Sequence, residues 1–153
     1  MAMRTSTKGR YGVRAMVDLV RHQGPEPVRL RDIAERQGIS DHYLEQLFSS
    51  LRKAGLVRSV RGTKGGYELV GDPSEVTVGD ILRVLEGPIG PVECVEDEDS
   101  LTHCDRGDVC ATRLLWKRLH DAIASVVDST TLADLVEEAS RLEQKTAPPM
   151  YYI

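Results

Sequence analysis

The chain has no long run of apolar residues. Nowhere in its 153 residues do about 18 apolar side chains follow one another, and a shorter run cannot cross a bilayer as a helix. The N-terminus also lacks the charged, apolar and small-residue order of a secretory leader. We therefore expect a cytoplasmic protein that does not associate with a membrane.

Signatures of catalysis are missing as well. The sequence has no Gly-rich phosphate loop, and no serine, histidine and aspartate stand in the context of a nucleophilic triad. The four histidines are scattered along the chain, whereas a zinc hydrolase needs histidine and carboxylate ligands around one open position. We therefore expect a protein that is not an enzyme.

Charge is distributed unevenly. Residues 1–71 hold 13 lysines and arginines against 7 acidic residues, a net charge of +6, whereas residues 72–153 hold 7 against 17, a net charge of −10. The apolar fraction of 41% is enough for one compact domain or for two small lobes that share a core. The asymmetry is typical of a nucleic-acid-binding lobe joined to a separate sensing or assembly lobe.

The basic half has the pattern of a helix-turn-helix. Apolar residues recur at helical spacing over residues 7–22, over a short segment closed by Gly38, and from the N-cap Ser40 to Gly55. Only the short turn 37–40 separates the second of these helices from the third. In such a motif the second helix of the pair lies in the major groove of DNA.

A β-hairpin follows the three helices. Residues 56–60 and 67–70 alternate apolar and polar side chains, and the segment between them is Gly-rich and basic. Arg58, Arg61 and Lys64 favour a contact with a phosphate or the minor groove, although any surface hairpin needs glycines at its turn. Residues 1–71 are therefore predicted to form a mainly α domain with a small hairpin wing, a winged helix-turn-helix.

The acidic half is predicted to hold helices around one long loop. A short helix begins at the capping sequence of Thr77, a long one runs over residues 111–128, and the last begins at Thr131. The loop 87–110 has no periodicity, and loops of this length are usually functional or disordered. The predicted divisions are a linker helix with its sensor loop (72–110), a dimerisation helix with a terminal helix (111–143), and a tail (144–153).

The helix 111–128 is long for so small a protein. The domain has too little surface to cover its apolar stripe, so we expect two copies to pack along it as a twofold homodimer. The alternative is that the helix covers its own winged helix-turn-helix. A dimer would set two recognition helices one turn of double-stranded DNA apart and would read a pseudo-palindromic operator.

All three cysteines lie in the loop, at Cys94, Cys104 and Cys110. Soft thiolates at these spacings suit an iron–sulfur cluster or zinc; redox-active thiols, or cysteines without a function, are the alternatives. The neighbouring carboxylates are expected to raise the thiol pKa values, which disfavours a redox sensor that needs a free thiolate. A bound metal would supply the missing positive charge.

Three stretches of the chain resemble a known family. They are RTSTKGRYGVRAM, DIAERQGISDHYLEQLFSSLRKAGLVRSVRGTKGGYEL and VTVGDILRVLEGP. They are similar to the IscR/CymR-type (Rrf-two) family of winged helix-turn-helix transcription regulators. The resemblance runs from about residue 3 to residue 145 and implies a DNA-binding homodimer.

One branch of this family senses iron–sulfur status and controls genes of iron–sulfur cluster biogenesis. The resemblance implies that the three cysteines hold a [2Fe–2S] cluster. The family pattern is C-x5-C-x5-C-x2-H, but here nine residues separate the first two cysteines, and Arg113, which stays protonated, stands at the histidine position. The fourth ligand is then His103, a loop carboxylate, a backbone atom or a group from elsewhere in the dimer. His120 is disfavoured because it lies about 15 Å along the helix.

The other branch represses cysteine metabolism together with cysteine synthase. The segments GPIGPVECVEDED and DSTTLADL and the terminal MYYI are similar to it, although its members commonly lack the cysteines. The resemblance implies that the tail ending in Tyr152 and Ile153 enters the active site of the partner enzyme. An ordinary frayed terminus is the alternative.

Resemblance and geometry together give the expected DNA contacts. The start of the third helix is expected to face base edges in the major groove, Arg61 is expected to enter the minor groove, and Tyr43 is either a base contact or a core residue. In the iron–sulfur branch, the glutamate matching Glu45 is linked to discrimination between operator classes. The expected DNA-contacting residues are Lys8, Arg10, Ser40, His42, Tyr43, Glu45, Gln46, Arg61, Gly62 and Lys64.

Overall fold

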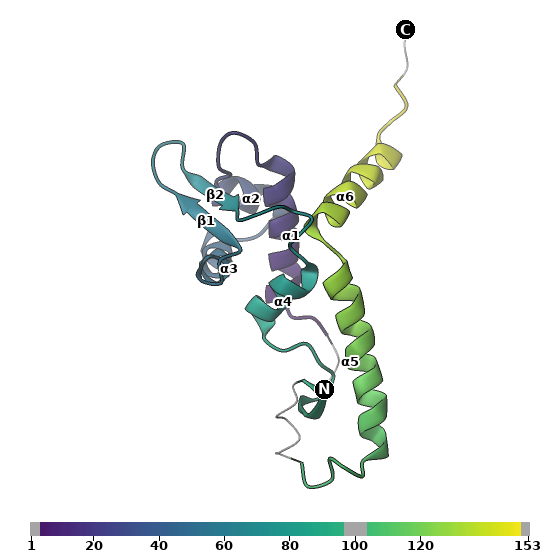
Figure 1. Ribbon diagram of the computed structural model, residues 1–153. Helices are drawn as coiled ribbons and strands as arrows, with labels where there is room; N and C mark the ends of the chain where they lie inside the picture. Colours follow the sequence, from purple (N-terminus) through teal and green to yellow (C-terminus); the bar gives the residue numbers. More distant parts are fainter. Residues whose placement is uncertain (1–3, 97–103, 151–153) are drawn as a thin grey trace.

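The computed structural model describes residues 4–96 and 104–150. In chain order its elements are α1 (Thr7–His22), α2 (Leu30–Gln37), α3 (Asp41–Lys53), β1 (Val57–Val60), β2 (Gly66–Leu69), α4 (Val78–Glu86), the 3₁₀ turn η1 (Glu93–Val95), α5 (Ala111–Ser129) and α6 (Leu132–Thr146). Helices α1 to α4 and the hairpin form one head, and α5 extends past it as a rod (Figure 1). The fold is the predicted mainly α arrangement with a two-stranded wing.

Helix α1 runs through the middle of the head. Its residues Ala15, Met16 and Leu19 are fully buried, and the helix packs against α2, α3, α4 and α6. Gly12 permits the close approach of α4, because a Cβ atom at this position would collide with the side chain of Leu85. The missing side chain therefore seats α4, and with it the start of the cysteine loop, directly on α1.

The predicted helix-turn-helix is confirmed. Gly38 is the C-cap of α2, and its left-handed backbone (φ 64°) is one that glycine adopts without strain. Ser40 caps α3. The inner face of α3 is buried in the core, where the rings of Phe48 and Tyr67 meet edge-on at 5.1 Å between centroids. The opposite face of α3 is left free to meet a partner.

The wing is joined to the helix-turn-helix by a third segment. Strands β1 and β2 pair antiparallel, with Val57 opposite Leu69 and Val60 opposite Gly66. Val28, between α1 and α2, exchanges two backbone hydrogen bonds with Tyr67, at 2.9 and 2.7 Å. This bridge has no sequence signal, and it fixes the wing relative to the recognition helix.

Helices α5 and α6 differ slightly from their predicted bounds. Helix α5 starts as predicted and ends one residue late, at Ser129, and none of its residues is fully buried in this chain. Helix α6 continues to Thr146, into the tail predicted from residue 144. It ends where Ala147 precedes Pro148, because a residue before proline disfavours the helical conformation. Within the described residues, no helix has the length and apolar content needed to span a membrane.

One carboxylate is buried in the head. The side chain of Asp18 on α1 is 2% exposed and accepts hydrogen bonds from Arg36 Nη2 at 2.7 Å and from Gln37 Nε2 at 2.8 Å. The hydrogen bond to Asp18 is the main reason why the pKa of Arg36 is raised. Because both donors lie at the end of α2, this buried charge fixes the turn from which α3 starts.

We expect Arg36→Met to lower the free energy of unfolding by about 2–4 kcal/mol, because it leaves the Asp18 carboxylate buried without its cation. The control is Arg31→Met on the same helix, whose pair with Glu35 is exposed on both sides (79% and 68%) and should contribute less than about 1 kcal/mol. Urea unfolding measures both variants. Equal losses would contradict a role for the buried pair.

Candidate DNA-binding face and cysteine loop

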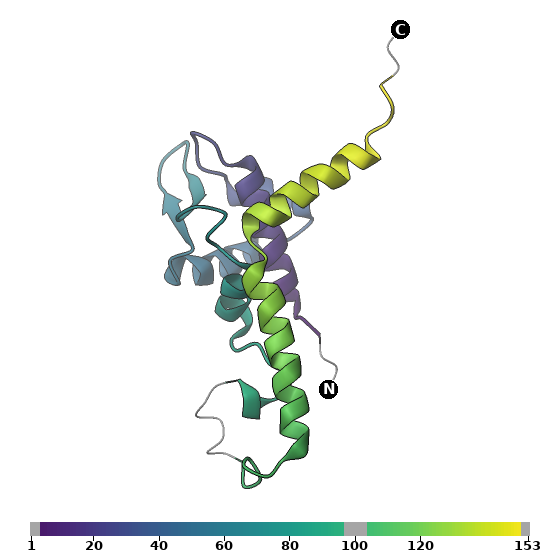
Figure 2. The same ribbon diagram turned by 45° about the vertical axis from the view of Figure 1, so that its right-hand side comes forward.

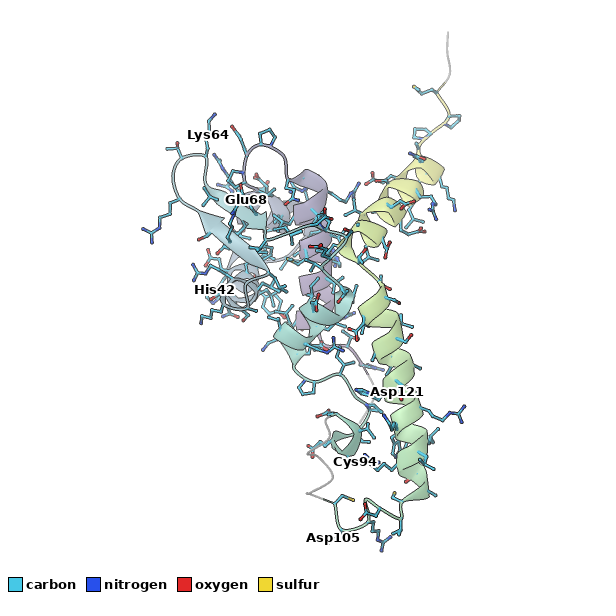
Figure 3. The ribbon with its side chains drawn as sticks, in the orientation of Figure 1. His42, Lys64, Glu68, Cys94, Asp105 and Asp121 are labelled. Carbon is cyan, nitrogen blue, oxygen red and sulfur yellow. The ribbon has the colours of Figure 1, made fainter. Side chains whose placement is uncertain are left out.

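The expected base-reading residues of α3 form one exposed face. Ser40, His42, Glu45 and Gln46 are all exposed, on the side of α3 opposite its buried leucines. Figure 3 shows His42 on the outer side of the head, and Lys64 of the wing lies on that side as well. Helix α5 lies beyond the other side of the head (Figure 1). Recognition helix and wing therefore face the same way, and away from α5.

Two of the expected DNA-contacting residues, Ser40 and Tyr43, also have partners within the head. Ser40 Oγ accepts a hydrogen bond from the Tyr43 backbone N–H at 3.2 Å, and the hydroxyl keeps its own hydrogen to donate. The half-buried ring of Tyr43 meets Tyr11 edge-on at 6.1 Å, and its hydroxyl donates to Thr7 Oγ1 at 3.4 Å. The Tyr43 ring thus packs against α1, while its hydroxyl lies beside the start of that helix.

The tip of the wing is exposed and basic. Arg61, Gly62 and Lys64 are all exposed, and Gly62 has a φ of 113°, which a residue with a side chain rarely adopts. Lys64 Nζ lies 3.0 Å from Glu26 Oε1, but both side chains are well exposed. Since exposed ion pairs contribute little, a phosphate can replace this carboxylate easily.

Two positioning residues have no signal in the sequence. Arg29 donates from Nη2 to the Thr63 carbonyl at 2.8 Å and so supports the wing tip. Glu86, the last residue of α4, accepts hydrogen bonds from the N–H and the hydroxyl of Ser6, at 2.6 and 2.5 Å. Ser6 caps α1, so Glu86 fixes the start of that helix. The expected phosphate contacts in its first turns are both exposed: Lys8 and Arg10.

The described ends of the cysteine loop, residues 91–96 and 104–110, lie near the end of α5 farthest from α6 (Figure 2). Cys94 belongs to η1 and Cys110 is the N-cap of α5; both are half-buried, whereas Cys104 is exposed. Arg113 Nε donates to the Cys94 carbonyl at 3.3 Å, and η1 packs on α5. The first and third cysteines therefore both lie along the first turns of α5.

The structure describes only some of the other expected metal-ligand and partner-binding residues. Within residues 4–96 and 104–150, no three histidine, cysteine or acidic side chains are grouped closely enough to hold one metal ion. His103, Tyr152 and Ile153 lie outside the described residues. His120 lies on the half-buried side of α5, with its Nδ1 atom 3.3 Å from Asp121.

The thiol of Cys110 behaves differently from the expectation. Acidic surroundings were expected to raise the thiol pKa values, but this is wrong for Cys110, whose pKa is lowered. The largest cause is the hydrogen bond with Thr112 Oγ1 at 3.2 Å, followed by the backbone N–H of Arg113, and the charge of Arg106 adds to it. Donors in the first turn of α5 touch the sulfur directly and outweigh the acidic composition of the loop.

We expect Thr112→Val to raise the Cys110 pKa. A lowered pKa means that the thiolate persists to lower pH, so loss of the hydroxyl shifts the midpoint of alkylation toward higher pH and slows labelling at neutral pH. Iodoacetamide labelling of metal-free, reduced protein, followed by mass spectrometry of each cysteine, measures this. Labelling of Cys104 serves as the internal control. An unchanged Cys110 profile would contradict the role of the hydroxyl.

An exposed recognition helix with a basic wing beside it defines the class: the protein is a winged helix-turn-helix DNA-binding transcription regulator. The Rrf2 family model, described as an iron-dependent transcriptional regulator, matches residues 5–138. The chain belongs to the Rrf2 family.

Relatives of two kinds are similar to the chain. The HTH-type transcriptional regulator CymR of Bacillus subtilis (strain 168) is 49% identical over 151 residues, 99% of this chain and 100% of that protein. IscR of Yersinia enterocolitica is 47% identical over 141 residues, 92% of this chain and 84% of that protein. The solved structure of T. potens IscR is 44% identical, with a TM-score of 0.75 over 99% of this chain and 96% of that one. The relatives are transcription regulators, not enzymes, and regulators of this family are dimeric.

Proposed function

We propose that a homodimer of this chain reads a pseudo-palindromic operator with α3 in the major groove and the wing at the minor groove. The exposed polar face of α3 supports this assignment most directly. Glu45 can accept from cytosine N4, and Gln46 can pair with adenine. Ser40 lies beside them as a donor, the Tyr43 hydroxyl, which donates to Thr7, can accept, and His42 completes the face. Arg61 and Gly62 meet the minor groove, while the phosphate contacts are Lys8, Arg10 and Lys64.

Arg61→Ala should weaken operator binding by about 1–3 kcal/mol, because an arginine in the minor groove contacts base edges as well as phosphates. The matched control is Arg141→Ala on α6, an exposed arginine paired with Glu137 and Glu138, away from the wing. Fluorescence anisotropy at fixed salt compares the two variants. If the Arg61→Ala and Arg141→Ala variants bound the operator with equal affinity, Arg61 would not be a DNA contact.

Helix α5 is the proposed dimer contact. Its residues Leu115, Leu119, Ala122 and Val126 follow one another at steps of four, three and four, which is the spacing of a coiled-coil seam. Leu115 is 50% exposed and Val126 is 64% exposed in the single chain. Packing two such stripes together would remove this apolar surface from water, which favours association.

Leu115→Glu should shift the protein from dimer to monomer, because it places a charge in each half of the seam without a partner for it. Leu114→Glu is the control, since Leu114 is also exposed (66%) but lies off the stripe. Sedimentation velocity at micromolar concentration separates the two species. A dimeric Leu115→Glu variant, or an equally monomeric Leu114→Glu variant, would contradict the seam.

The three cysteines are the proposed ligands of an iron–sulfur cluster, of the [2Fe–2S] type. Two of them already lie along the start of α5, and the lowered pKa of Cys110 favours the thiolate form that metals require. Arg113 cannot be the fourth ligand, because its guanidinium stays protonated and donates to the Cys94 carbonyl. His103 is the first choice for that position. A bound cluster would supply an iron- and redox-responsive centre at this end of α5.

Regulation would follow from a shift between two arrangements of the dimer. An ordered loop presses on α5 and α4, and these elements set the positions of the two DNA-reading heads. The protein is proposed to act in the cytoplasm, and the genes that it would regulate are those of iron–sulfur cluster biogenesis.

Protein purified without oxygen tests the cluster. We expect a brown protein with near-equal iron and acid-labile sulfide, and a colourless one when the three cysteines are replaced by alanine. Zinc is assayed in the same samples. Stoichiometric zinc without iron, or no metal after careful reconstitution, would exclude the cluster.

A second function is favoured by the full-length similarity to CymR, which is named the global cysteine regulator of B. subtilis. In this alternative, the chain represses cysteine metabolism with cysteine synthase as its partner, and the tail residues Tyr152 and Ile153 enter the enzyme. The thiols are then redox-active or incidental. A metal-free protein that binds cysteine synthase, and loses that binding when the last two residues are removed, would favour this function over cluster sensing.

A further inference from the structure

Two side chains on the exposed face of α3 are hydrogen-bonded to each other. His42 and Gln46 lie one turn apart on α3, both exposed, with the Nε2 atom of the imidazole 3.2 Å from the Nε2 atom of the amide. Neither residue is needed by the core, since the buried residues of this helix lie on its other side. The contact therefore organises the DNA-facing surface itself.

The chemistry of the two groups fixes the direction of this hydrogen bond. An amide nitrogen can only donate, so the imidazole Nε2 must accept, and the ring then carries its hydrogen on Nδ1. One hydrogen of the Gln46 amide is used in this bond. The Oε1 atom and the second N–H remain free, which leaves one acceptor and one donor side by side.

This free pair matches one base better than the others. Adenine offers a donor at N6 and an acceptor at N7 in the major groove, which is complementary to one amide acceptor and one amide donor. The reversed amide would turn both N–H groups outward, and two donors match the two acceptors of guanine, O6 and N7. The orientation of the Gln46 amide therefore decides between adenine and guanine.

We propose that His42 is a specificity-determining positioning residue, which holds the Gln46 amide in the orientation that reads adenine. The inference rests on the proposed DNA-binding function and adds to it how one base pair is selected. Within the described residues, His42 forms no hydrogen bond with its acidic neighbours on α3, Asp41 and Glu45, so the imidazole is free to accept from Gln46. Holding the side chain in place before binding also removes part of the ordering penalty on the DNA.

The test starts from a pool of duplexes with a randomised centre, from which the wild-type homodimer selects its binding sequence. Gln46→Ala then identifies the base pair that Gln46 reads, as the position whose preference disappears. Affinities for duplexes with each of the four base pairs at that position are compared for wild type, His42→Ala and His42→Gln. Glu45→Ala is the control for a neighbouring contact.

We expect His42→Ala to reduce the preference for adenine over guanine at the Gln46 position by about threefold to tenfold, with an unchanged melting temperature. His42→Gln should restore most of the preference, because its Oε1 atom can accept the same hydrogen bond. Glu45→Ala should alter a different base pair. A His42→Ala variant that keeps the preference, or changes only another base pair, would overturn the inference. Failure of the wild type to select any sequence would instead overturn the proposed DNA-binding function.

Discussion

The arrangement of the molecule depends on α5, a helix that its own chain covers on one side only. Its inner side is half-buried against α4 and η1, while Leu115 and Val126 remain exposed on the other side. An apolar stripe of this kind associates in water. Because Cys110 is the N-cap of the same helix, the proposed dimer seam and the proposed sensor meet at this element.

A chain of hydrogen bonds joins this element to the candidate DNA-binding face. Arg83 of α4 makes two hydrogen bonds to Asp128 of α5, at 2.6 and 2.9 Å. Glu86, three residues further along α4, binds the Ser6 cap of α1, and the next residue, Thr7, accepts from the Tyr43 hydroxyl on α3. Such a path carries a signal only if some element has two arrangements, and the relation of α5 to its partner copy is the natural place for one.

Much of the fold could be predicted because its signals are local. The N-cap at Ser40 and the capping boxes at Thr77 and Thr131 mark helix starts within three residues of sequence, and each is present in the structure. The alternating strands and the glycine-rich turn likewise specify the wing. Helix α6 extends beyond its predicted end because good helix formers continue until proline intervenes.

Two of the features that could not be predicted join segments far apart in the chain. The bridge from Val28 to Tyr67 and the bond from Ser6 to Glu86 exist only once the core has brought their elements together. The lowered pKa of Cys110 depends on hydrogen-bond donors within the first turn of α5, which composition does not reveal. The pairing of His42 with Gln46 could have been predicted from the sequence, since residues four apart on a helix are neighbours.

The most direct measurement is anaerobic operator binding by the same preparation with and without its cluster, with iron and sulfide measured in each sample. If the loop is coupled to the heads through α5, the two forms should differ in affinity for at least one operator by about fivefold or more. Identical dissociation constants across all selected operators, at verified cluster content, would show that the cysteine loop does not control DNA binding.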